Sequence, residues 1–121
     1  KITFDKETSL DGLFSEMTFL KTIEGLSNLD TSKVTDMGSM FRECSSLETL
    51  DVSGFDTSNV TDMASMFYGC KKLKSIDVSH FDTSKVKNIR QYMLTVLYNA
   101  PATINQFYDA EVRHDMYIPD R

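Results

Sequence analysis

The chain has 121 residues, of which 40% are hydrophobic and 26% are charged, and its formal net charge is −5. This length supports one modest hydrophobic core and excludes two ordinary globular domains, and no apolar run reaches the roughly 18 residues that a membrane-spanning helix needs. Residues 1–86 carry nine Lys and Arg against fourteen Asp and Glu, whereas residues 87–121 carry four of each kind. Because an acidic surface repels phosphate, we expect no nucleic-acid binding by residues 1–86. Because no apolar run is long enough, we expect no insertion into a membrane.

A 26-residue repeat organises the chain between about residues 10 and 88. An eroded first copy at residues 13–23 matches the next copy with an offset of 27, and Gly25 is expected to absorb the extra residue. The period is set by the following matched positions: Asp30, Asp56 and Asp82; Thr31, Thr57 and Thr83; Val34, Val60 and Val86; Met37 and Met63; Met40 and Met66; Phe41 and Phe67; Cys44 and Cys70; Leu47 and Leu73; Phe55 and Phe81.

Each unit predicts a short strand followed by a short helix. Residues 47–55 end in period-two alternation of apolar residues, which favours a strand with one buried face. Residues 60–70 place apolar residues at spacings of three, three, one and three, which is typical of a helical stripe. A unit of this kind cannot bury its apolar face alone. We therefore predict an α/β fold, a leucine-rich-repeat-like solenoid over residues 1–88 with strand–helix units near 10–33, 34–59 and 60–86.

The tail departs from the repeat. Residues 89–98 have a helical pattern that breaks at residues 99–101 and resumes towards residue 116, and Pro101 is suited to the first turn of a new helix. The sequence therefore predicts a C-terminal helical hairpin over residues 89–121 that caps the end of the solenoid.

The wording of the repeat, Phe-Asp-Thr-Ser-Asn-Val-Thr-Asp-Met-x-x-Met-Phe-x-x-Cys-x-x-Leu at residues 55–73, closely resembles the BspA-like leucine-rich repeats of bacterial surface proteins. The resemblance covers about residues 10–88. It implies a non-catalytic interaction or adhesion module, extracellular or at the cell surface. Phe55 and Phe81 stand where leucine-rich repeats usually have Asn or Cys, which predicts a phenylalanine spine in place of an asparagine ladder.

The C-terminal residues resemble a second, different family. Residues 98–116 are similar to the C-terminal helical region of replication initiators from plasmids and mobile elements of Gram-positive bacteria. That resemblance implies a fusion, or a cytoplasmic protein whose C-terminal helices contact replication machinery or DNA. No apolar signal segment follows Lys1, and a processed signal would leave the same start, so the compartment stays open.

The exposed strand face is the predicted binding surface for a protein or glycan. Lys21, Glu48 and Lys74 alternate in charge from unit to unit, beside a ladder of carboxylates at Glu24, Asp51 and Asp77. A solvated acidic face is favoured over a calcium site, and no cofactor is expected. A purely structural spacer is the alternative. The predicted binding residues are Glu24, Glu48, Thr49, Asp51, Ser53, Lys74, Ser75, Asp77 and Ser79.

The remaining reactive residues favour structural roles. Cys44 and Cys70 fall at equivalent positions, so a disulfide is conceivable, but their place on the apolar stripe favours buried free thiols. His80 is interpreted as a surface substitution at the position of Gly54, and His114 beside Asp115 as a surface pair. With no nucleophile motif, phosphate loop or metal-ligand spacing, we expect no catalytic residue, no metal site and no enzyme activity.

Overall fold

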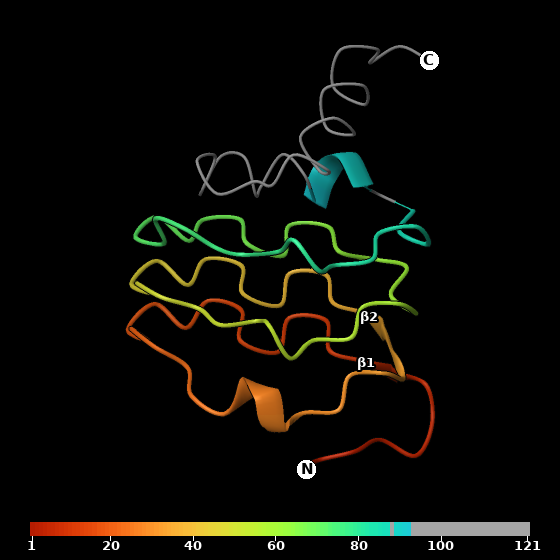
Figure 1. Cartoon of the computed structure of the whole chain (residues 1–121). Helices are drawn as coiled ribbons and strands as arrows, with labels where there is room; N and C mark the ends of the chain where they lie inside the picture. The colour runs from red at the N-terminus through yellow and green to blue at the C-terminus, as the bar shows by residue number, and fades with distance from the viewer. Residues whose placement is uncertain (88, 93–121) are drawn as a thin grey trace.

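The computed structural model describes residues 1–87 and 89–92 and contains few regular elements there (Figure 1). These are strand β1 (Thr8–Ser9), the 3-10 helix η1 (Leu26–Asn28) and strand β2 (Val34–Asp36), and residues 89–92 are helical. β1 and β2 pair in parallel, with Thr8 opposite Val34, and form a small two-stranded sheet. Within the described part of the chain, no helix is long and apolar enough to cross a bilayer.

The prediction of a leucine-rich-repeat-like solenoid built from strand–helix units is wrong. The predicted strand over residues 47–55 is not assigned as a strand, and residues 60–70, expected to be helical, form turns and a single β-bridge. The predicted helical hairpin of residues 89–121 lies outside the described residues, except for the helical residues 89–92. The 26-residue period produces layers of turns and extended backbone that lie one above another (Figure 1).

The apolar stripe is built from consecutive tight turns. The N–H of Cys44 donates to the carbonyl of Phe41 at 3.2 Å, and the N–H of Leu47 donates to the carbonyl of Cys44 at 3.2 Å, each spanning three residues. Ser39 and Glu43 have positive φ angles of 54° and 61°. Right-handed helix requires negative φ throughout. Turns of this length repeat apolar residues every three or four positions, as a helix does, so the spacing alone does not separate the two.

Backbone amides in these turns bond to the next layer. The N–H of Ser39 donates to the carbonyl of Ala64 at 2.8 Å, and the N–H of Phe41 donates to the carbonyl of Met66 at 2.9 Å. The same pattern joins the first layer to the second, where the N–H of Phe14 donates to the carbonyl of Met40 at 2.8 Å. Amides that a helix would use internally therefore hold neighbouring layers together.

The extra residue of the first unit falls where the sequence places it. Gly25 adopts a left-handed φ of 84° at the start of η1, and no corresponding helix is assigned in the later units. Leu26 at the start of η1 is buried, as is Val52 one period later. The repeat register is regular from Thr31, because Thr31 and Asp56 are 25 positions apart, as are Thr57 and Asp82. The inserted residue is therefore accommodated before Thr31.

The core consists of equivalent side chains stacked between layers. Met37, Met40, Met63 and Met66, which recur at matched positions of the repeat, are each fully buried. Phe55 and Phe81 are buried as well, but the parallel ring stack runs elsewhere. Its members are Phe14, Phe41 and Phe67, with ring centroids 5.5 and 5.8 Å apart and interplanar angles of 6° and 1°.

Threonine hydroxyls also connect successive layers, through hydrogen bonds to the backbone. Thr31 Oγ1 accepts a hydrogen bond from the N–H of Asp56 at 2.7 Å and donates to the carbonyl of Asp56 at 3.1 Å. Thr57 repeats the arrangement with Asp82 at 2.8 and 3.2 Å. Both threonines are buried, with 1% and 2% of their surface exposed. These hydroxyls satisfy backbone groups between layers, a role that the sequence reasoning did not assign to them.

Candidate functional site

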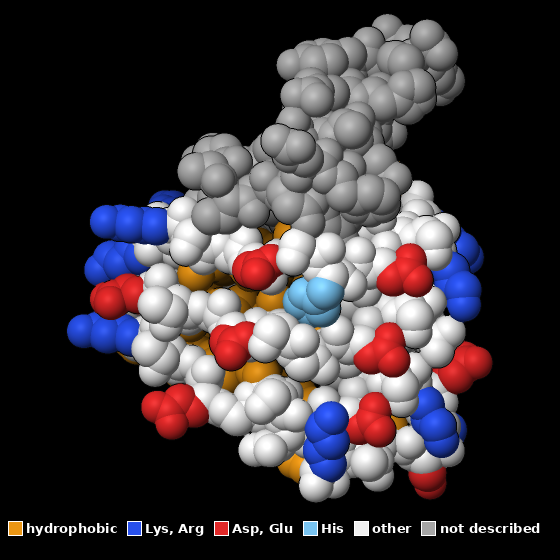
Figure 2. Space-filling model, in the orientation of Figure 1, with side chains coloured by type: hydrophobic (Ala, Val, Ile, Leu, Met, Phe, Trp, Pro, Cys, Tyr) orange, Lys and Arg blue, Asp and Glu red, His pale blue; other side chains and the backbone are white. Residues whose placement is uncertain are grey.

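The predicted binding residues lie on three extended segments that follow the turns. Residues 20–30, 47–58 and 73–84 run one above another on the near side of the molecule in Figure 1. We call the exposed side chains of these segments the front face. Figure 2 shows acidic side chains across its middle, whereas most lysine and arginine side chains lie towards its lateral edges, where acidic side chains stand among them. All nine predicted residues are exposed: Glu24, Glu48, Thr49, Asp51, Ser53, Lys74, Ser75, Asp77 and Ser79.

Asp51 and Asp77 are held in fixed orientation by turns of their own. Asp51 Oδ1 accepts a hydrogen bond from the N–H of Ser53 at 2.9 Å, and Asp77 Oδ1 accepts one from the N–H of Ser79 at 3.0 Å. Hydrogen bonds from the hydroxyl and the N–H of these serines lower the pKa of both carboxyl groups below the ordinary value of 3.8. Both carboxylates are therefore ionised at neutral pH.

His80 lies close to this carboxylate pair and links two layers. Its Nε2 is 3.0 Å from the carbonyl oxygen of Val52, and its ring meets Phe81 edge-on with centroids 5.0 Å apart. Its charge also helps to lower the pKa of both Asp51 and Asp77. Sequence reasoning interpreted His80 only as a surface substitution. Two features of the sequence could have identified His80: it replaces Gly54 of the preceding unit, and it stands three residues after the predicted binding residue Asp77.

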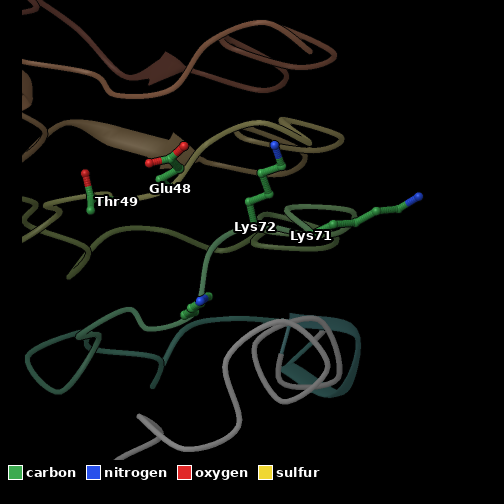
Figure 3. A pocket seen from close by; sticks show the side chains of 5 residues that line it. Glu48, Thr49, Lys71 and Lys72 are labelled. Carbon is green, nitrogen blue, oxygen red and sulfur yellow. The ribbon is translucent and has the colours of Figure 1, made fainter.

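A hollow at one edge of the front face brings three predicted residues together with two that were missed. It has a volume of about 570 Å³ and is lined by Glu48, Thr49, Lys71, Lys72 and Lys74; we call it the lysine hollow. In Figure 3 the Lys72 side chain extends towards the layer of Glu48, whereas Lys71 points outwards from its turn. The adjacent Lys71 and Lys72, three and two positions before Lys74, were the unused signal in the sequence.

The lysines of this hollow have no carboxylate within ion-pair distance among the described residues. Arg42 and Glu16, which lie in the turn segments, form an ion pair at 3.8 Å. The Arg42 guanidinium also lies over the Tyr68 ring, 5.5 Å from the ring centroid. Glu24, Ser53, Ser75 and Ser79 do not line the lysine hollow. The predicted residues thus divide into a basic edge and a carboxylate strip beside it.

Two further hollows lie away from the predicted residues. One, of about 520 Å³, is lined by Lys33, Asn59 and Lys85 among others, and the Lys85 ammonium donates to Asn59 Oδ1 at 3.2 Å. The other, of about 490 Å³, is lined by residues 16–20 and includes Phe19, which is 93% exposed. The sequence reasoning singled out neither of them.

The cysteines are packed as core residues. Both are free and fully buried, as the apolar stripe predicted. Cys44 Sγ donates to the carbonyl of Phe14 and Cys70 Sγ to that of Phe41, each at 3.1 Å. Burial raises the pKa of Cys44 and raises that of Cys70 to about 12, so neither thiol is ionised at neutral pH. In the part of the chain that the structure describes, His, Cys, Asp and Glu form no group of three suited to a metal ion.

Comparison with known proteins gives a family and no closer relative. A family model described as "Mycoplasma protein of unknown function, DUF285" matches residues 8–117. The match runs through the repeats and across the boundary predicted at residue 88. No curated protein and no solved structure matched the chain. Because the model covers nearly the whole sequence, the chain belongs to the DUF285 family of mycoplasma proteins of unknown function.

Proposed function

We propose that this chain is a non-catalytic interaction module that binds a protein or glycan through the front face, as part of a bacterial surface protein. The observation that carries the proposal is the alignment of exposed polar side chains over successive layers, with Asp51 and Asp77 fixed by hydrogen bonds from Ser53 and Ser79. Fixed side chains lose little conformational entropy when they bind a partner.

The stacked layers also suit a binding role because they place equivalent residues at a regular spacing. Asp51 and Asp77 stand at equivalent positions of successive extended segments that lie one above another (Figure 1), so they offer two carboxylates to the same partner. Thr49 and Ser75, exposed between the basic edge and the carboxylates, add hydroxyl groups that both donate and accept. Repeat proteins commonly use such extended surfaces for recognition.

The test compares wild type with a variant that removes charge and keeps the turns. Asp51→Asn with Asp77→Asn retains an oxygen that accepts from Ser53 and Ser79, whereas lysine at these positions would remove the acceptor. Both proteins are applied to a glycan array and to a cell-surface protein fraction, and retained ligands are identified. We expect at least a tenfold loss of affinity in the variant for each ligand found.

The matched control changes charge away from the front face. Asp5→Asn with Glu7→Gln removes the same two charges at exposed positions near the N-terminus. Ligand binding by this control should equal that of wild type. Equal binding by all three proteins would refute the proposal and leave a spacer role for the module.

A further inference from the structure

We propose that the front face recognises a polypeptide carrying both charges, with an acidic group seated in the lysine hollow and a basic group on Asp51 and Asp77. This inference rests on the proposed function and assigns it a protein partner. Its starting point is the uneven charge of the front face. A basic hollow at one edge adjoins a strip of carboxylates in the middle.

The hollow is suited to an anionic group. Lys71, Lys72 and Lys74 line it together with the single acidic residue Glu48, and in Figure 3 Lys72 extends towards the layer of Glu48 while Lys71 points outwards. None of these lysines pairs with a carboxylate among residues 1–87 and 89–92 within ion-pair distance. Three lysines that form no ion pair within the described part of the chain line a space of about 570 Å³, and their combined charge favours one carboxylate of a partner there.

The strip beside the hollow is suited to a cationic group. Asp51 and Asp77 are exposed, and their pKa values are lowered by hydrogen bonds from Ser53 and Ser79. Next along the segments stand Asp56 and Asp82, which are close enough for the charge of Asp82 to oppose ionisation of Asp56. A partner that extends from the hollow across the front face therefore meets a series of negative charges.

This arrangement disfavours a polyanionic glycan and favours a polypeptide. A sulfated or uronic-acid chain that fills the hollow would bring further negative groups onto Asp51, Asp77 and Asp56, and like charges brought together at an interface cost binding free energy. A polypeptide can place an acidic and a basic side chain at the required separation. Lys74 and Asp77 are three residues apart in extended backbone, which is at most about 10 Å, or about three residues of an extended ligand.

The test uses synthetic peptides and the full chain. Twelve-residue peptides in a Gly-Ser-Thr background carry one glutamate and one lysine separated by one to six positions, and binding is measured by fluorescence anisotropy at low salt. We expect the highest affinity at a separation of about three residues. Heparin and poly-glutamate, as polyanion probes, should bind at least tenfold more weakly per charged group. Flat affinity across separations, no peptide binding, or tighter binding of heparin would overturn the inference.

Matched variants show whether the lysine hollow itself is used. Lys71→Glu, Lys72→Glu and Lys74→Glu together should lower the affinity of the best peptide at least tenfold. The control, Lys33→Glu with Lys85→Glu and Lys87→Glu, makes the same change in net charge at the other end of the segments and should leave affinity within twofold. An equal loss in both would mean that net charge alone governs binding and would overturn the inference.

The outcomes also separate this inference from the proposed function. If ligands captured from the surface fraction are lost in the Asp51→Asn and Asp77→Asn variant but kept in the triple lysine variant, the front face binds and the lysine hollow is not used. If captured ligands persist in both variants, the proposed function itself fails. Loss of the captured ligands in both variants, together with the peptide preference described above, supports both the proposed function and this inference.

Discussion

The hydroxyl of Thr31 holds both backbone groups of Asp56, accepting from its N–H at 2.7 Å and donating to its carbonyl at 3.1 Å. The two residues are 25 positions apart and lie in adjacent layers. One buried side chain therefore completes the hydrogen bonding of a peptide segment in the next layer, and Thr57 does the same for Asp82.

Replacing Thr57 with valine tests these hydrogen bonds between layers. The shape is nearly unchanged, but the N–H and carbonyl of Asp82 lose their partner, and we expect a loss of about 1–3 kcal/mol in the free energy of unfolding. Urea denaturation followed by circular dichroism measures it. Thr49→Val, at an exposed position, is the control and should change stability by no more than about 0.5 kcal/mol. Equal effects at the two positions would contradict the role given to Thr57.

Replacing Phe41 with alanine tests the ring stack. Phe41 lies between Phe14 and Phe67 and is fully buried, so its removal leaves a cavity between layers. We expect a destabilisation of about 3–5 kcal/mol, measured as a fall in the urea midpoint. Phe19→Ala removes the same side chain where it is 93% exposed and should leave the midpoint almost unchanged. A similar shift for both variants would refute the assignment of the stack as core.

Glu43 and Gly69 occupy the same place in successive units, and both have positive φ angles, of 61° and 80°. Glycine adopts this conformation without the steric cost that other residues bear. We therefore expect Glu43→Gly to stabilise the chain and Gly69→Ala to destabilise it, each by about 1 kcal/mol.

Thermal unfolding of the two variants measures both shifts. A Cβ at Gly69 would also lie 2.7 Å from the Glu43 carboxyl group. Gly69→Ala is therefore repeated with Glu43→Ala, which removes that contact and should not restore stability if φ is the cause. Full recovery in the double variant would instead identify the side-chain contact as the cause. Glu48→Gly, in an extended segment, should destabilise the chain.

Stability should fall in acid because five carboxyl groups are held by serines two residues later. The pKa values of Asp30, Asp51, Asp56, Asp77 and Asp82 are all lowered from 3.8 in the folded state by these hydrogen bonds. Their contribution is present above the unfolded value of 3.8 and is lost as pH falls through the lower folded values. Urea midpoints measured from pH 7 down to pH 2 should therefore decline below about pH 4.

Asparagine at Asp30, Asp56 and Asp82 supplies the control for this pH dependence. The amide oxygen keeps the turn acceptor but does not titrate, so the decline below pH 4 should become shallower. An unchanged acid profile in this triple variant would contradict the linkage. The profile would then have to come from other groups.

The sequence predicted which residues stack and which are buried, but not the local backbone. Met37, Met40 and Phe41 recur one period later at Met63, Met66 and Phe67, and all are buried because equivalent residues of adjacent layers meet. Their spacing also fits a helix, and the prediction of helices was wrong. Whether the segment forms turns or a helix depends on which carbonyl accepts the hydrogen bond of each backbone N–H. The N–H of Phe41 donates to the carbonyl of Met66 in another layer, and local spacing cannot reveal such a partner.

The candidate site was predicted in part for a similar reason. Asp51 and Asp77 were identified because they recur in the repeat, and the structure places both on the exposed front face. Lys71 and Lys72 have no repeat counterpart, since the preceding unit has serines at positions 45 and 46, so a search for periodic residues passed over them. The contact between His80 and the Val52 carbonyl was not predicted, because it exists only where the two layers stack.

The alternation of amide donors and carbonyl acceptors along the turn segments restricts how the length of this protein can change. Residues 37, 39, 41 and 43 donate to residues 62, 64, 66 and 68, so a one-residue insertion in a turn segment would put every later donor out of register. Adding or removing a complete unit leaves the register intact. The turn segments are therefore expected to be gained or lost only as whole repeats, whereas a single extra residue is tolerated outside them, as at Gly25.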